Sequence, residues 1–260
     1  MYTILTNKAA KGRKGAIVAI VAGVKAEDVI QILRKIPEKK RRKVKEITLD
    51  MAGNMELIAK RSFPLAVRVT DRFHVQQLAT EALQEMRIKH RWAALDAENE
   101  AIEKAKKENY DFQSSFLSNG DTLKQLLARS RYVLYKRAEN WTENQKERAG
   151  LLFERYPDLK QAYDLSMALS NIFEKTTDKI YALAKLATWD EKVRQAGFKA
   201  FNTISKSIHN HYQTIVNYFD NRSTNASAES FNAKLKAFRS QFRGVRNIEF
   251  FMYRLTQIYA

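Results

Sequence analysis

Two carboxylates far apart in the chain stand where a divalent cation could be held. Asp50 directly follows the apolar run Val44–Leu49, and Glu229 lies near the start of an amphipathic helical pattern from Asn225 to Phe242. Carboxylate oxygens are the ligands of hard cations such as Mg²⁺, which keeps several waters and needs only a few protein oxygens. We therefore expect Asp50 and Glu229 to be the main catalytic residues and metal ligands, sharing one cation.

A second acidic motif, Asp71-x-x-His74, follows the short apolar run Leu65–Val69. One interpretation places Asp71 and His74 at or near the metal site. The other is structural, with Asp71 capping the next helix and His74 packing against a sheet. Both interpretations stay open at this point. The remaining histidines, His90, His209 and His211, lack the spacing of a zinc site and are interpreted as structural or surface residues.

The helical pattern around Glu229 carries two neighbouring faces. At 100° per residue, an apolar face within about 80° of arc holds Ala228, Phe231, Leu235, Phe238 and Phe242. The adjoining face holds Glu229, Asn232, Lys236, Arg239 and Arg243. An acid at the start of a basic stripe suits a phosphodiester, because the carboxylate can hold a cation while Lys236, Arg239 and Arg243 contact the nucleic-acid backbone. Asn232 is a near-site candidate. Taken alone, a glutamate near a helix start, such as Glu229, is more often a residue that interacts favourably with the helix dipole.

The chemistry that such residues would perform is phosphoryl transfer. That reaction on DNA uses two cations about 4 Å apart, one activating the attacking water or 3′-hydroxyl and the other stabilising the leaving oxygen. Mg²⁺ or Mn²⁺ is the expected cofactor, in a two-metal site if the ligand set is complete.

The elements before residue 75 predict a small α/β core. Residues 2–22 read as a hairpin, and a helix is predicted from Ala26 to Ile36, followed by a solvated basic loop at Lys39–Lys43. Strand 44–49, helix 54–62 and strand 65–69 form a crossover unit, so the two strands are predicted to be parallel. Asp50 and Asp71 then lie at the carboxyl ends of these strands, where functional groups of open α/β sheets collect.

From Val75 to about Tyr218 the pattern is helical. Asp121 is predicted to start one helix and Pro157 to occupy the first turn of another. Capping boxes are predicted at Thr142 with Gln145 and at Thr188 with Glu191. The helix after this region carries Glu229, whose carboxylate suits a site at the sheet. The predicted fold class is therefore α/β with a large all-α insertion between the sheet and that helix.

Composition narrows the class of protein further. The net charge of +17 over 260 residues favours a polyanionic partner, a nucleic acid above all. The absence of cysteine excludes disulfides, thiolate catalysis and a zinc ribbon within these residues, and is compatible with a reducing cytoplasm. No apolar run reaches the length of a membrane span.

The ordered motifs resemble those of bacterial insertion-sequence transposases of the ISL-three family. The resemblance rests on Ile47–Met51, Phe63–Ala66, Asp71–Val75, Arg87–Trp92 and the segment from Asn225 to Lys236. It implies a DDE transposase with a ribonuclease-H-like fold, an Asp, Asp, Glu triad binding Mg²⁺, and a helical insertion before the Glu. Asp50 then matches the second acid and Glu229 the third. The expected partners are insertion-sequence ends, target DNA and a second copy in a homodimer or higher oligomer, and the expected location is cytoplasmic and nucleoid-associated.

The sequence departs from the family pattern at its start, where no Asp precedes Asp28, a residue of the predicted helix. We therefore expect a partial core, with the first strand and the first catalytic Asp missing, and no strand cleavage by this chain alone. The predicted parts are a first core segment at 1–97, a helical insertion at 98–220 and a C-terminal catalytic helix at 221–260. Two other functions stay open: a non-catalytic DNA-binding or regulatory remnant, and a ribonuclease-H-like nuclease or resolvase.

Overall fold

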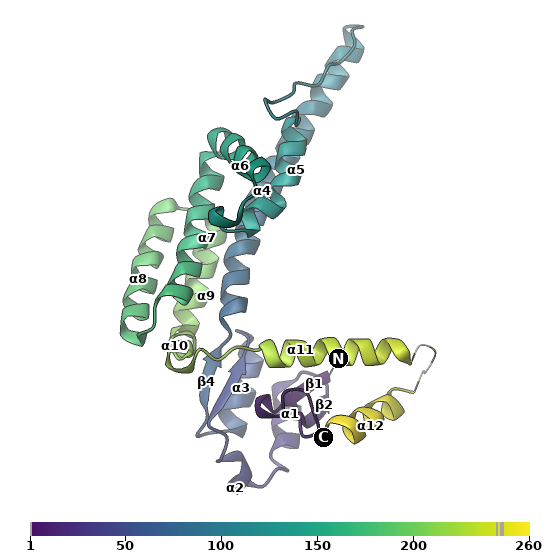
Figure 1. Cartoon of the computed structure of the whole chain (residues 1–260), viewed down its shortest axis with the longest axis vertical. Helices are drawn as coiled ribbons and strands as arrows, with labels where there is room; N and C mark the ends of the chain where they lie inside the picture. The colour runs from purple at the N-terminus through teal and green to yellow at the C-terminus, as the bar shows by residue number, and fades with distance from the viewer. Residues whose placement is uncertain (1, 243, 245–246) are drawn as a thin grey trace. The chain divides into compact units, whose positions relative to one another are not determined.

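The computed structural model describes residues 2–242, 244 and 247–260. The chain forms two compact units, one of Met1–His74 with Gln213–Ala260 and the other of Val75–Tyr212. The boundaries predicted from the sequence were 97/98 and 220/221. The boundaries between the compact units fall inside two continuous helices, α4 (Arg72–Lys107) and α9 (Lys199–Val216), so helical periodicity in the sequence does not mark them. The elements are labelled in Figure 1.

The first unit begins with the predicted hairpin. Strands β1 (Tyr2–Thr6) and β2 (Ile17–Ala22) pair antiparallel, with an irregularity between Leu5 and Thr6. Helix α1 (Ala26–Leu33) follows and ends before the predicted Ile36.

The basic run after Pro37 was predicted to be a solvated loop. It is solvated, because Lys39, Lys40, Arg42 and Lys43 are exposed, but the prediction of a loop was wrong, because residues 38–41 form a short helix, α2 (Glu38–Arg41). The Arg41 guanidinium donates hydrogen bonds to the carbonyl oxygens of Ile36, at 3.0 Å, and Ser62, at 2.7 Å. These two bonds satisfy carbonyl groups at the ends of neighbouring segments, so the run is partly used to hold the fold.

The predicted crossover unit is confirmed. Strand β3 (Glu46–Leu49), helix α3 (Gly53–Ser62) and strand β4 (Val67–Thr70) follow in order, and β3 pairs parallel with β4 from Glu46↔Val67 to Leu49↔Thr70. Among the described residues the strands form two separate two-stranded sheets, β1–β2 and β3–β4. The architecture is therefore mixed α/β with few, short strands.

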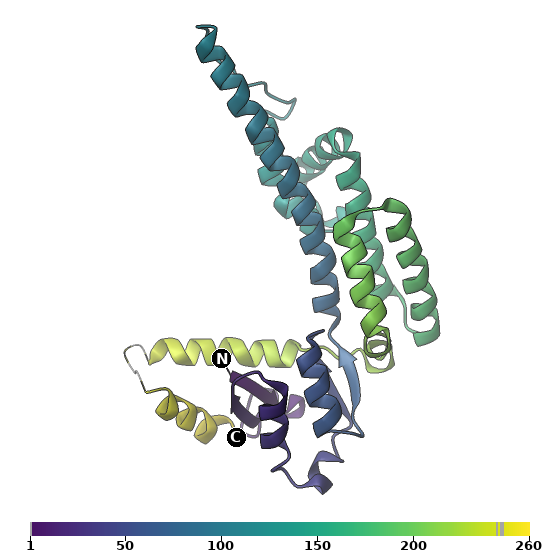
Figure 2. The ribbon, with the colours of Figure 1, turned by 180° about the vertical axis from the view of Figure 1, so that it is seen from behind.

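Two apolar clusters hold this unit together. One joins β2, α1 and α3 through Val21, Val29, Ile30, Ile58 and Phe63. The other joins β2 to α11 (Ala226–Gln241) and α12 (Ile248–Tyr259). In the second cluster Phe231 and Leu235 from the predicted apolar face of α11 are buried with Phe251 and Leu255 of α12. Both views show α11 and α12 beside the hairpin (Figure 1 and Figure 2). Helix α12 was not predicted from the sequence.

The second unit is helical. Besides most of α4 and α9, it contains α5 (Leu123–Tyr135), α6 (Glu143–Arg155), α7 (Pro157–Lys175) and α8 (Lys179–Ala196). A short helix, α10 (Tyr218–Asn221), belongs to the first unit. No helix among the described residues is long and apolar enough to cross a membrane.

The capping residues predicted from the sequence can be compared with the first residues of the observed helices. The capping box of Thr142 with Gln145 and the place of Pro157 in the first turn of α7 are confirmed. Thr122, one residue after the predicted Asp121, caps α5. The box predicted at Thr188 was wrong, because Thr188 lies inside α8 and its hydroxyl donates to the Ala184 carbonyl.

Candidate metal site

One buried carboxylate joins three elements of the first unit. Asp71 follows β4, is fully buried, and its backbone N–H extends the parallel ladder to the Leu49 carbonyl at 2.9 Å. Its Oδ1 accepts the Phe73 N–H at 3.1 Å, which caps the start of α4. Its Oδ2 accepts the Asn225 N–H at 3.0 Å, immediately before α11. Asp71 therefore fixes the end of β4, the start of α4 and the start of α11 to one another.

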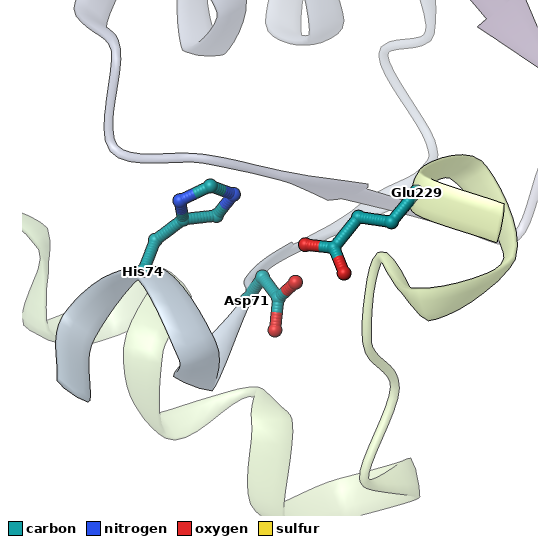
Figure 3. A group of neighbouring side chains, drawn as sticks. All are labelled: Asp71, His74 and Glu229. Carbon is teal, nitrogen blue, oxygen red and sulfur yellow. The ribbon is translucent and has the colours of Figure 1, made fainter. Parts of the chain in front are cut away.

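This junction brings Glu229 to the same place. Glu229 lies one turn into α11, where its N–H donates to the Asn225 carbonyl at 2.9 Å. Asp71, His74 and Glu229 each offer a ligand atom, and these atoms all lie within 4.8 Å of one another. Figure 3 shows the two carboxylates pointing toward each other, with the His74 ring on the first turn of α4 nearby. Asp71 is buried, His74 half-buried and Glu229 exposed, so solvent reaches the group from one side.

Further hydrogen bonds hold the strand that leads to Asp71. The hydroxyls of Thr70 and Thr214 are hydrogen-bonded at 2.8 Å in the interior. The Asn217 amide donates to the Arg68 carbonyl at 2.8 Å. The end of α9 and the residue after it thus support β4 from residues almost 150 positions later in the chain. Such support keeps a ligand side chain in one geometry, which a metal site requires.

The three groups fit a divalent cation. Two carboxylates held close together repel each other unless a cation or a proton lies between them. Carboxylate oxygens suit Mg²⁺ and Mn²⁺, whereas an imidazole nitrogen is favoured more by transition metals. A mixed set of two oxygens and one nitrogen therefore fits Mn²⁺ at least as well as Mg²⁺. Among the described residues, this is the one group of three or more His, Asp and Glu side chains with such spacing.

Asp50, the expected partner of Glu229, is not a member of this group. It follows β3, and its Oδ1 accepts the Ala52 N–H at 3.0 Å in the turn before α3. It also lines a cavity whose wall includes Asn225 and Ala228 at the start of α11. Asp50 thus lies at the same end of the unit as Glu229, and the sharing of one cation by these two residues stays a prediction.

The predicted polar face of α11 is exposed. Glu229, Asn232, Lys236 and Arg239 are all exposed. The Arg239 guanidinium also lies over the Phe251 ring, 5.1 Å from its centroid. Arg243, the last member of the predicted basic stripe, lies outside the described residues.

Sequence reasoning missed the hydrogen bond between Asp71 and Asn225. The two residues are 154 positions apart, and the donor is a backbone N–H, which any residue except proline supplies. The Asp-x-x-His motif was the one signal available, and it left the structural and ligand interpretations open. The structure shows that Asp71 caps α4 and also belongs to the candidate ligand group.

The fold and this group define the class: a mixed α/β protein with a candidate divalent-metal site where parallel strands end. Comparison with protein families then gives a specific result. The model of the ISL-three (ISL3) DDE family, described as "Transposase", matches residues 1–255. The chain therefore belongs to the ISL-three family of DDE transposases. No curated protein and no solved structure matches the chain.

Proposed function

We propose that this chain is the catalytic region of an insertion-sequence transposase, which cleaves DNA strands and transfers them with the help of a divalent cation. The observation that carries the proposal is the convergence of the Asp71, His74 and Glu229 ligand atoms within 4.8 Å. Family membership supplies the class of reaction. We further propose that β1 to β4 with α1 and α3 form a partial ribonuclease-H-like core, and that the second unit is the family's helical insertion.

In this proposal each residue has a stated role. Asp71 and Glu229 hold a cation through carboxylate oxygens, and His74 supplies a third ligand. Asp50 is the candidate ligand for a second cation at the same end of the unit. A bound cation would activate a water or a 3′-hydroxyl and stabilise the leaving oxygen of a phosphodiester. Lys236 and Arg239 on the exposed face of α11 would contact the DNA backbone, together with Arg243, and Asn232 would lie near the site.

The ligand group also sets an expectation for activity. Two-metal phosphoryl transfer needs carboxylates that bridge and hold two cations. The group offers two carboxylates and one imidazole, and no third acid belongs to it among the described residues. Cleavage by the chain alone would therefore need Asp50 to hold a second cation beside this group, and without that ligand we expect the chain to bind a cation and DNA but not to cleave the strand.

The experiment measures Mn²⁺ binding by titration calorimetry and nicking of element-end DNA in the same preparations. Glu229→Gln should weaken Mn²⁺ binding at least tenfold, whereas Glu249→Gln should not. Glu249 is a suitable control because it is also an exposed glutamate in the first turn of a helix, α12. Equal Mn²⁺ affinity in the two variants would refute the metal site.

The nicking assay separates the remaining possibilities. Mg²⁺-dependent nicking of element ends that disappears in Asp50→Ala would show that the chain is active alone and would overturn the expected lack of cleavage. Preference for four-way junctions over element ends would favour a resolvase.

A second candidate, a DNA-binding protein without catalysis, is favoured by the net charge of +17 and the exposed basic face of α11. It predicts salt-sensitive DNA binding that does not depend on Mn²⁺. In that case Asp50→Asn would leave DNA affinity unchanged or slightly raise it, because one negative charge is removed. DNA affinity that rises with Mn²⁺ and loses this dependence in Glu229→Gln would instead favour the catalytic region.

A further inference from the structure

The turn that joins β1 to β2 carries a run of cations with only small residues between them. Residues 8–15, the basic turn, read Lys-Ala-Ala-Lys-Gly-Arg-Lys-Gly, and no Asp or Glu lies between Tyr2 and Ala26. All four cations of the basic turn are exposed: Lys8, Lys11, Arg13 and Lys14. Protein surfaces ordinarily intersperse charges of both signs, so a stretch of one sign indicates attraction of an anionic partner.

Backbone hydrogen bonds hold the basic turn in one conformation. The Asn7 N–H donates to the Ala16 carbonyl at 2.8 Å, and the Arg13 N–H donates to the Ala10 carbonyl at 2.9 Å. Lys11 adopts the left-handed conformation, with φ 50° and ψ 39°. That conformation disfavours residues with a Cβ, and glycine is its usual occupant. A lysine at this position therefore indicates that its side chain is used.

The basic turn also offers backbone donors to an anion. Within the described part of the chain, the N–H groups of Gly12, Lys14 and Gly15 find no acceptor. Successive N–H groups at residues that include the left-handed conformation form anion-binding concavities. Gly12 and Gly15 have no side chain, so a phosphate group can approach these N–H groups closely.

Packing against α11 places another cation beside the basic turn. Ala16 and Ile17, which follow the turn, are buried with Phe231 of α11. The Lys234 ammonium of α11 lies 3.5 Å from the Gly12 carbonyl oxygen, and Lys234 is exposed. None of the ion pairs between described residues includes Lys234 or a cation of the basic turn. These cations therefore form one surface that no carboxylate of the described residues neutralises.

The same helix leads from this surface to the candidate metal site. Between Glu229 and Lys234 the rise along the axis of α11 is roughly 7.5 Å, at about 1.5 Å per residue. A strand of DNA rises by about 3.4 Å per nucleotide, so this separation corresponds to roughly two nucleotides. A DNA strand that reached the metal would therefore have its neighbouring phosphates beside Lys234 and the basic turn.

We propose that the basic turn and Lys234 bind the backbone phosphates of DNA that flank the phosphodiester at the metal site. Lys8, Lys11 and Lys14 each neutralise one phosphate, and the N–H groups of Gly12 and Gly15 donate to phosphate oxygens. The flanking position rests on the proposed function. The phosphate contacts themselves need no metal and no particular DNA sequence, so they can be measured apart from it.

The test measures the affinity of the full chain for a fluorescein-labelled DNA duplex of mixed sequence, without metal, by anisotropy over a range of salt concentrations. In the triple variant Lys8→Gln, Lys11→Gln and Lys14→Gln, the slope of log affinity against log salt should become shallower by about 2.7, about 0.9 for each lost phosphate contact.

The matched control removes the same charge elsewhere in the first unit. It is the triple variant Lys39→Gln, Lys40→Gln and Lys43→Gln, in the basic run after Pro37. These three lysines are also exposed, and they lie outside the apolar cluster that joins the hairpin to α11. This variant should keep the slope of the wild type.

A crosslink tests the location of the DNA. The chain contains no cysteine, so a single introduced thiol carries the label alone. Lys14→Cys labelled with azidophenacyl bromide should crosslink to the duplex on illumination, whereas Lys39→Cys should not. Fe²⁺ with ascorbate then generates hydroxyl radicals at the metal site, and the cut should fall within about five nucleotides of the crosslink.

Three results would overturn the proposal. Equal slopes in the two triple variants would show that the slope reports total charge only. Equal crosslinking of Lys14→Cys and Lys39→Cys would show no preference for the basic turn. A cut more than about ten nucleotides from the crosslink would separate the turn from the metal.

The failure of the proposed function has a different signature. A wild-type chain that binds no Mn²⁺, but whose salt slope still depends on the basic turn, would lack the catalytic site and keep the phosphate contacts. Conversely, an unchanged slope in the triple variant of the turn, with a shallower slope in Lys236→Gln, would refute the role of the turn and leave the proposed function intact.

Discussion

Replacing Asp71 with asparagine tests the junction and the metal site together. The two carboxylate oxygens of Asp71 each accept one backbone N–H, from Phe73 and from Asn225, in a fully buried position. Asparagine keeps one acceptor oxygen and places an NH₂ group in the other position. One buried N–H then faces a donor, and the start of α4 or of α11 loses its cap.

The expected loss of stability in Asp71→Asn follows from the one hydrogen bond that the substitution removes. A hydrogen bond to a charged group contributes about 1.5–3 kcal/mol, so Asp71→Asn should lower the free energy of unfolding of the metal-free protein by about that amount. Glu229→Gln removes an exposed charge whose carboxylate accepts no hydrogen bond from the residues that the structure describes, and its effect without metal should stay within about 0.5 kcal/mol. Mn²⁺ at about 100 times its Kd should stabilise the wild type by about 2.7 kcal/mol, and neither variant should gain this.

The assay is thermal unfolding with and without Mn²⁺, followed by circular dichroism. For a chain of this size, 1 kcal/mol corresponds to about 2–4 °C in Tm. The control, Glu249→Gln, should behave as the wild type in both conditions. If metal-free Asp71→Asn matched the wild type in Tm, the double hydrogen-bonding role would be refuted. If Glu229→Gln kept the full Mn²⁺ gain, Glu229 would not be a ligand.

Three further predictions concern charge and titration. Lys236→Gln and Arg239→Gln should each reduce the slope of log affinity for DNA against log salt by about 0.9, measured by fluorescence anisotropy, and unchanged slopes would place DNA elsewhere. Burial raises the pKa of Tyr163 to about 12. The unfolded state therefore ionises first, and the stability present below pH 10 should fall by roughly 1–3 kcal/mol as the pH rises from 10 to 12 in urea titrations, but not in Tyr163→Phe. Burial works to raise the pKa of Asp121, but hydrogen bonds from Arg148 and a second arginine outweigh it and hold this pKa below its usual value. Its stabilising contribution, present above about pH 4, should be lost as the pH falls further. Asp121→Asn should abolish that part of the acid sensitivity, and an unaltered acid transition would contradict the assignment.

Local patterns in the sequence were enough to predict much of the fold. The hairpin at residues 2–22 and the parallel pair β3–β4 followed from short apolar runs and the length of the connection between them. The apolar face of α11 followed from helical spacing, and Phe231 and Leu235 are buried as predicted. Each of these features depends on residues close together in the chain.

What the sequence could not supply depends on distant contacts. The position of Asp71 beside Glu229 depends on where α11 begins, and the hydrogen bond that joins Asp71 to that point spans 154 residues. The pattern Thr-x-x-Glu at Thr188 occurs inside helices as well as at their starts, so the pattern alone could not place a boundary. Helix α12 was missed, although its residues Phe251 and Leu255 are buried in the apolar cluster that joins β2 to α11 and α12.

The central claim is that Asp71, His74 and Glu229 share one divalent cation, and anomalous diffraction from crystals soaked in Mn²⁺ tests it most directly. The account predicts an anomalous peak bonded to a carboxylate oxygen of Asp71, a ring nitrogen of His74 and a carboxylate oxygen of Glu229. A well-ordered first unit with no peak among these three side chains, or with Mn²⁺ bound by Asp50 and by none of them, would contradict it.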